Sequence, residues 1–160
     1  MKKKIVVLGF LGTNLDQGGK ARWGRWRPTI SLGQQDDLLV DRFELFYEKN
    51  FLDLAQLVQK DFQQVSPETE FNLREVVLKD PWDFQTVYSG IFDNLKDYKF
   101  DTDNEEYLVH ITTGTHVIQI CLFLLTESRH IPGKLLQTHM QKSRNPNGTY
   151  TIIDLDLSKY

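Results

Sequence analysis

The segment that most constrains the fold is residues 107–125, where a short apolar run, a turn rich in threonine and glycine, and a longer apolar run follow one another. This order predicts a buried strand over residues 107–111, a turn, and a helix over residues 115–129. Such a turn presents free backbone N–H groups, the positive end of a helix dipole and several hydroxyls at one point. A phosphate or a nucleotide is therefore the expected occupant.

The rest of the chain alternates between strand-like and helix-like segments. The aliphatic run at residues 4–8 ends at Gly9 and is typical of a central strand buried on both faces. Residues 20–35 leave two alternatives open, a short helix beginning at Pro28 or an extended segment at 29–32. Further strands are predicted in the latter half of 38–47 and at 70–78, and further helices at 50–65 and from Asp80 and Pro81 to Leu95. Two last strands, 134–141 and 149–157, are joined by a hairpin-type connection at 145–148.

This order predicts a single domain, residues 1–160, of the α/β class. We expect a Rossmann-like, mostly parallel sheet with helices on both faces and a C-terminal β-hairpin. The net charge of −3 excludes a general attraction to nucleic acid or acidic membranes, so any polyanion site must be local. The single cysteine, Cys121, excludes an internal disulfide and fits a reducing compartment. No apolar run is long enough for a signal core or a membrane span, and we expect a cytoplasmic protein that makes no membrane contact.

Two loops are candidates for a ligand site, because the carboxyl ends of parallel strands open a crevice near the point where the strand order reverses. The dinucleotide-binding fingerprint fails at Leu11, and a P-loop fails at Asn14 and Ala21, so an ordinary dehydrogenase or NTPase is excluded. The alternative for the second loop is that Thr112 or Thr113 only caps the helix. The predicted ligand-binding residues are Gly9, Phe10, Gly12 and Thr13 in the first loop, and Thr112, Thr113, Gly114, Thr115 and His116 in the second.

A basic segment at residues 19–27 combines four cations with two tryptophans. Guanidinium groups contact phosphates and indoles stack on bases, so Lys20, Arg22 and Arg25 are further predicted ligand contacts. The alternative is a surface segment whose tryptophans pack inward. Asp80 is expected to cap the following helix, His110 to be a core residue and Cys121 an inert buried thiol. We predict no metal site, no cofactor and no catalytic residue.

The predicted helix at 115–129 is apolar nearly all round, whereas a surface helix would present a polar face. One side covers the sheet, and the other side needs a second cover. A symmetric partner would supply it, so a homodimer through this helix is expected. The two copies of the threonine-rich turn would then adjoin across the axis and form one shared pocket.

Four motifs, in order, carry a family resemblance: residues 9–13, 22–29, 80–84 and 110–116. The chain resembles the N-terminal sensor domain of sigma-54-dependent regulators of RNA repair operons, a divergent branch of the CRISPR-associated Rossmann fold (CARF) family. CARF domains are dimers that bind oligoadenylates across the two-fold axis through loops after the first and fourth strands. The basic residue usual after the Gly-Thr pair is replaced here by His116.

The resemblance implies a ligand-sensing domain and not an enzyme. Its expected ligand is an RNA end, such as a 2′,3′-cyclic phosphate, or an oligoadenylate, and binding would relieve autoinhibition of an ATPase domain. That ATPase domain, a DNA-binding domain and sigma-54 RNA polymerase are the expected partners in a full-length protein, and we expect both domains to be absent from residues 1–160. The alternative function is a metal-independent ring nuclease or RNA phosphodiesterase.

Overall fold

A computed structural model describes residues 2–141 and 147–154. Its one sheet has six strands in the order β3-β2-β1-β4-β5-β6. The first five strands are parallel to their neighbours, and β6 is antiparallel to β5. This arrangement confirms the predicted mostly parallel α/β sheet with a final hairpin. The strands are β1 (Lys4–Phe10), β2 (Arg42–Tyr47), β3 (Glu70–Glu75), β4 (Glu105–His110), β5 (Gly133–His139) and β6 (Thr149–Ile153).

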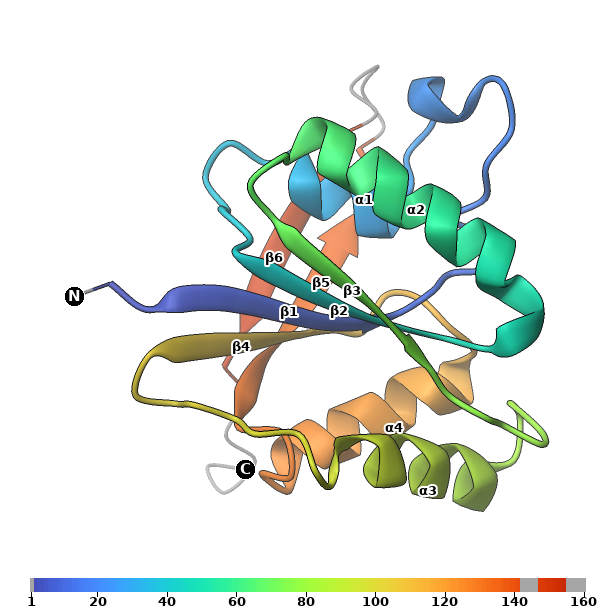
Figure 1. Cartoon of the computed structure of the whole chain (residues 1–160), viewed down its shortest axis with the longest axis vertical. Helices are drawn as coiled ribbons and strands as arrows, with labels where there is room; N and C mark the ends of the chain where they lie inside the picture. The colour runs from blue at the N-terminus through green and yellow to red at the C-terminus, as the bar shows by residue number, and fades with distance from the viewer. Residues whose placement is uncertain (1, 142–146, 155–160) are drawn as a thin grey trace.

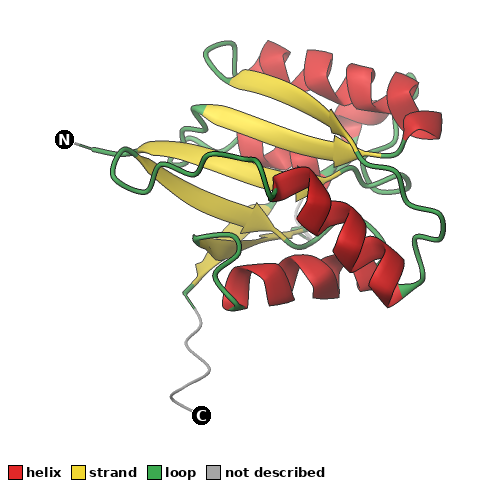
Figure 2. Ribbon diagram, turned by 60° about the horizontal axis from the view of Figure 1, so that its bottom comes forward, coloured by secondary structure: helices red, strands yellow, loops and turns green. Residues whose placement is uncertain are grey.

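Helices cover both faces of the sheet, as predicted. In Figure 1, α1 and α2 lie on one face, and α3 and α4 lie side by side on the other; Figure 2 shows the same layers after a tilt. Apart from two short 3-10 turns, η1 (Arg22–Gly24) and η2 (Lys49–Phe51), these are the helices of the described residues. Within that part of the chain, no helix is long and apolar enough to cross a membrane. The helices are α1 (Pro28–Gly33), α2 (Leu52–Val65), α3 (Phe84–Leu95) and α4 (His116–Glu127).

The central strands are buried on both faces because successive side chains of a strand point to opposite sides. Val6 and Leu8 of β1 enter the core under α3 and α4, and Val7 enters the core under α1 and α2. All three side chains are fully buried. The continuous aliphatic run therefore contributes side chains to two hydrophobic cores. Because both of its faces are buried, β1 lies at the centre of the sheet.

Several element boundaries differ from the sequence expectation. Strand β1 continues through Phe10, so Gly9 and Phe10 belong to the strand and not to the loop. Pro28 does begin a helix, which decides between the two alternatives for residues 20–35. Helix α3 begins at Phe84, and its cap is Asp83, whose carboxylate accepts a hydrogen bond from the Thr86 N–H at 3.0 Å. The expected cap, Asp80, is wrong: its carboxylate accepts from the Trp82 N–H in the preceding turn. Residues 142–146 and 155–157 of the predicted hairpin lie outside the described residues.

Candidate functional site

The two predicted loops meet at the carboxyl edge of the sheet. They follow β1 and β4, which are parallel neighbours with Gly9 paired to His110. Strand order reverses here, because the chain runs from β1 to β2 on one side and from β4 to β5 on the other. In Figure 1 this edge lies at the right-hand ends of the strands, where α3 and α4 begin. The structure therefore brings the two loops to the position where open parallel sheets bind ligands.

A direct contact joins the loops. The buried Thr113 hydroxyl donates to the Phe10 carbonyl oxygen at 2.5 Å. A Cβ atom added to Gly12 would lie 2.9 Å from the Thr113 methyl carbon, closer than packing allows. Gly12 is thus required where the loops touch, and Thr113 fixes the spacing between them.

The threonine hydroxyls are engaged within the protein, and this differs from their predicted availability to a ligand. Thr112 Oγ1 accepts from the Thr138 N–H at 2.9 Å. Thr115 Oγ1 accepts from the Ile118 N–H at 3.1 Å and donates to the Pro81 carbonyl at 2.9 Å. Thr115 is therefore the helix cap, and the alternative that Thr112 or Thr113 caps α4 is wrong. These hydroxyls hold the shape of the turn.

Backbone N–H groups are what the turn leaves open to a ligand. In the described structure, the N–H groups of His116 and Val117 at the start of α4 have no hydrogen-bond partner. Gly114 adopts φ +91°, and a Cβ there would also approach Ile118. The Gln119 amide donates to the carbonyls of Thr112 and Gly114 at 3.2 and 3.0 Å. The arrangement can bind an anion through backbone donors and the helix dipole.

Asp16 shapes the first loop, and the sequence analysis missed it. Its buried carboxylate accepts from the Gly12 N–H at 2.8 Å, from the Thr29 N–H at 2.9 Å and from the Thr29 hydroxyl at 2.6 Å. Burial raises the pKa of Asp16, and the hydrogen bonds from Thr29 and Gly12 act against that rise. The sequence did contain a signal for this role, namely an acidic residue ahead of a helix that starts with proline. The signal was missed because Asp16 and Thr29 are thirteen residues apart in the chain.

Two arginines of the basic segment, Arg22 and Arg27, form ion pairs with Asp61 inside the protein. Arg27 is only 2% exposed and donates twice to Asp61 of α2, at 2.8 and 2.7 Å. Arg22 donates to the same carboxylate at 2.8 Å. The Arg27 guanidinium also lies over the Trp23 ring, 5.2 Å from its centroid. Trp23 packs against the hydrophobic core, in line with the inward-packing alternative.

The other two predicted contacts of this segment remain exposed. Arg25 donates to the carbonyls of Asn14 and Leu15 at 3.1 and 3.0 Å, so it closes the first loop on itself. Lys20 is exposed and has no polar partner within the described residues. The contacts of Arg22, Arg25 and Lys20 with a ligand stay predictions.

Two further reactive side chains, His110 and Cys121, are buried. His110 is fully buried, and burial lowers its pKa to about 3, so its ring is neutral. Its Nε2 lies 2.9 Å from the Thr138 hydroxyl, as befits the predicted core histidine. Burial raises the pKa of Cys121 to about 11, which matches an inert thiol. Across residues 2–141 and 147–154, no group of three potential ligands gathers at a metal-binding distance.

Comparison with known proteins assigns the family. Residues 3–160 match the model of the family described as Regulator of RNA terminal phosphate cyclase, RtcR. The chain belongs to this family. It is 47% identical over 163 residues to the transcriptional regulatory protein RtcR of Escherichia coli strain K12, an alignment that covers 99% of this chain. The same alignment covers 31% of the E. coli protein, so the chain spans about a third of its relative.

Solved structures confirm the CARF-like fold predicted from the sequence. Enterococcus italicus Csm6 bound to cyclic hexa-2′-fluoro-hexa-dAMP superposes with a TM-score of 0.67 at 14% identity, over 87% of this chain and 35% of Csm6. Can2 from Sulfobacillus thermosulfidooxidans in complex with cyclic tetra-adenylate gives 0.57 at 17% identity, over 84% and 32% of the two chains. At these identities the likeness concerns the fold alone.

Proposed function

We propose that this chain is the ligand-sensing domain of a regulator of RNA repair genes. Its ligand would be an RNA end carrying a 2′,3′-cyclic phosphate, or an oligoadenylate, bound where the loops after β1 and β4 meet. The observation that carries the proposal is the open backbone N–H groups of His116 and Val117 at that meeting point. Family membership and the oligoadenylates bound to both similar structures support it.

Each part of the site would have a distinct task. The N–H groups of His116 and Val117 bind phosphate oxygens, and Gly12 and Gly114 let the ligand approach the backbone. Thr13 directly follows Gly12, is half-buried and offers a hydroxyl with no partner in the described structure. Lys20 and Arg25 would follow the backbone of a longer RNA. Binding would control a sigma-54-dependent ATPase elsewhere in the full-length protein.

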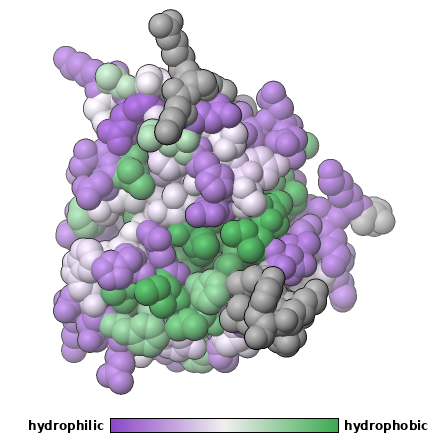
Figure 3. Space-filling view, turned by 180° about the vertical axis from the view of Figure 1, so that it is seen from behind, coloured by the Kyte–Doolittle hydropathy of each residue, from purple (hydrophilic) through white to green (hydrophobic). Residues whose placement is uncertain are grey.

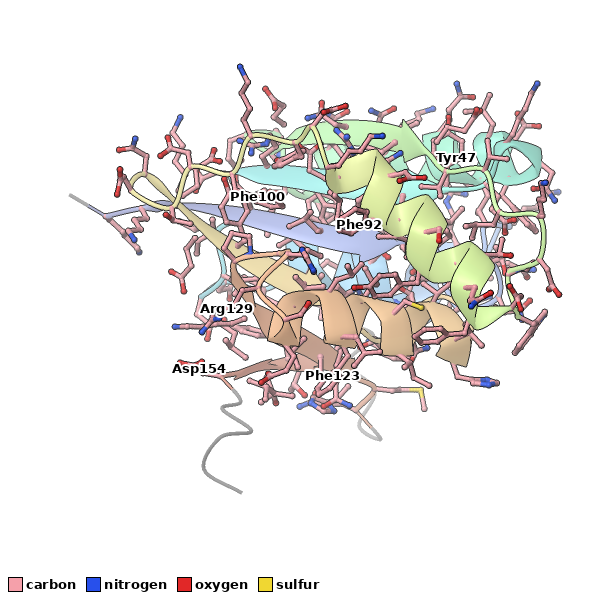
Figure 4. The ribbon with its side chains drawn as sticks, turned by 90° about the horizontal axis from the view of Figure 1, so that it is seen from below. Tyr47, Phe92, Phe100, Phe123, Arg129 and Asp154 are labelled. Carbon is pink, nitrogen blue, oxygen red and sulfur yellow. The ribbon has the colours of Figure 1, made fainter. Side chains whose placement is uncertain are left out.

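A homodimer through α4 is the second part of the proposal. Ile120 and Leu124 are 48% and 37% exposed on α4, although both are large and apolar. Phe123 points away from α3 in Figure 4, and apolar side chains gather on the rear face in Figure 3. A two-fold axis at this helix covers these side chains and adjoins the two copies of the ligand turn. Sedimentation of wild type and of Leu124→Asp tests it: we expect a dimer and a monomer, respectively.

Cleavage of the ligand is the competing function. His116 is exposed in the first turn of α4, so its imidazole is available for proton transfer, unlike that of the buried His110. Mass spectrometry of the RNA after prolonged incubation distinguishes the functions. An intact ligand is expected of a sensor, and a shortened product would assign the chain to the nucleases.

The binding test uses two substitutions at one position. His116→Ala removes the side chain and keeps the N–H, whereas His116→Pro also removes the N–H. Proline is tolerated there, because His116 is the first helical residue and Thr115 has the extended ψ of 160° that precedes proline readily. A hydrogen bond to a charged group contributes about 1.5–3 kcal/mol, so the proline variant should bind short cyclic-phosphate RNA about 10- to 150-fold more weakly than the alanine variant. Equal affinities would refute the backbone site, and no binding by wild type of either RNA or oligoadenylate would refute the proposed function.

A further inference from the structure

Trp82 presents an exposed indole beside the candidate site. It is 60% exposed, which is unusual for so large an aromatic side chain. Its ring centroid lies 5.2 Å from that of His116, with the planes inclined at 59°. His116 is the first residue of α4. The indole therefore lies against the side chain of the residue whose N–H group the proposed ligand would use.

The backbone around Trp82 is held in place while its ring stays open. The Pro81 carbonyl accepts from the Thr115 hydroxyl at 2.9 Å, which ties this connection to the start of α4. The Trp82 N–H donates to Asp80 at 3.0 Å, and Asp83 accepts from the Thr86 N–H at 3.0 Å and the Thr86 hydroxyl at 2.7 Å. A ligand that contacts the indole would bind a preorganised surface, without the entropic cost of ordering a loop.

Charge decides which part of a nucleotide can lie on the indole. Asp80 and Asp83 flank Trp82 in the sequence, and both are exposed. Hydrogen bonds from Thr86 lower the pKa of Asp83, so its carboxylate is ionised at neutral pH. Two carboxylates repel a phosphate but not a neutral base. A bound nucleotide would therefore place its phosphate toward α4 and its base toward Trp82.

We propose that Trp82 is a specificity-determining residue that stacks on the base of the nucleotide whose phosphate binds at α4. This inference rests on the proposed function and adds to it a requirement on the ligand. A base inside a duplex has both faces covered by its neighbours, so the recognised nucleotide must be unpaired or at the end of its strand. Stacking depends on the π-face that every base has, so Trp82 selects for a free base face more than for sequence.

The test pairs a change in the protein with a change in the RNA. Wild type, Trp82→Ala and Trp82→Phe are each titrated with a short single-stranded RNA ending in a 2′,3′-cyclic phosphate, and with the same RNA lacking its terminal base. Leu39→Ala is the matched control, because Leu39 is 63% exposed and apolar but precedes β2, at the opposite edge of the sheet. Dimer content is measured for every variant by sedimentation.

The stacking proposal predicts a non-additive pattern. Trp82→Ala should weaken binding of the complete RNA about 5- to 150-fold, and Trp82→Phe and Leu39→Ala much less. Removing the terminal base should weaken binding to wild type by a similar factor and should not weaken binding to Trp82→Ala further.

Four results would overturn it. If wild type binds the RNA and Trp82→Ala binds it equally well, Trp82 has no part in recognition, and the proposed function stands without it. If Trp82→Ala weakens binding of the complete and the base-free RNA by the same factor, the indole does not contact the base. If Trp82→Ala is no longer a dimer, the indole stabilises the protein and does not bind the ligand. If wild type binds neither RNA, the proposed function fails and the stacking proposal fails with it.

Discussion

Asp61 neutralises a buried arginine, and its replacement by asparagine gives a quantitative test of how the first loop is anchored. Arg27 directs two N–H groups at one Asp61 oxygen, at 2.8 and 2.7 Å. Burial lowers the pKa of Arg27, and the nearby charge of Asp61 acts against that shift. Asp61→Asn keeps the size of the side chain and removes the charge, so Arg27 is left in the interior without its counter-ion.

The magnitude follows from the burial of the pair. Both side chains are 1% exposed, so water cannot take over the role of the lost carboxylate. Two unit charges about 4 Å apart attract by roughly 4 kcal/mol at an effective dielectric constant near 20. Measured losses on removing one partner of a buried pair are about 3–5 kcal/mol. The asparagine oxygen still accepts one hydrogen bond, so we expect about 3 kcal/mol, a large part of the roughly 5–15 kcal/mol that stabilises a domain.

Urea unfolding followed by circular dichroism measures this loss. With a denaturant slope near 2 kcal/mol per molar, the midpoint should fall by about 1.5 M. Asp93→Asn is the matched control, because Asp93 is exposed on α3 and its charge is solvated, so its midpoint should not move. A shift below about 0.5 M in Asp61→Asn would refute the view that Arg27 depends on this carboxylate.

Two further predictions concern stability. The pKa of buried His110 is lowered to about 3, and an unfolded histidine titrates near 6.5, so below that pH the unfolded chain binds the extra proton. Stability should therefore fall by about 2 kcal/mol between roughly pH 7 and pH 5, and His110→Gln should flatten this dependence of the urea midpoint; an equally steep variant would contradict it. Arg129 follows α4 at φ 68°, where a side chain is strained, so Arg129→Gly should raise the free energy of unfolding by up to about 1 kcal/mol, whereas Arg129→Ala should not. A glycine variant no more stable than the alanine variant would count against that strain.

The fold was predictable from sequence because its signals are local. A pattern of only a few residues indicates the secondary structure of each segment, as in the aliphatic run of β1 and in the strand, turn and helix at residues 107–125. Their alternation then leaves the parallel sheet as the arrangement that covers every apolar face. Boundaries were less predictable: Asp80 and Asp83 are both acceptable caps, and the Thr86 hydrogen bonds select Asp83.

The contacts of the site were not predictable in the same way, because they join residues far apart in the chain. Arg22 was predicted as a phosphate contact from its own segment, and only the fold reveals that it donates to Asp61, 39 residues away in the chain. Asp16 meets Thr29 across a loop that has no periodic pattern. Sequence reasoning identified the two loops correctly as neighbours, but it assigned to a ligand several groups that the protein uses for itself.

Because the protein uses these side chains itself, fewer groups at this edge of the sheet remain to recognise a ligand. The hydroxyls of Thr112, Thr113 and Thr115 are all bonded to the protein, so the turn would meet the proposed ligand mainly through N–H groups that every residue except proline possesses. Backbone donors recognise an anion but do not sense whether a base face is free. That preference would therefore come from side chains at the rim, and Trp82 and His116 are the exposed rings that lie against each other there. Substitutions at these two positions should change how strongly a nucleotide with a free base face is preferred over one inside a duplex, whereas substitutions of the three threonines should chiefly change how stably the turn is held.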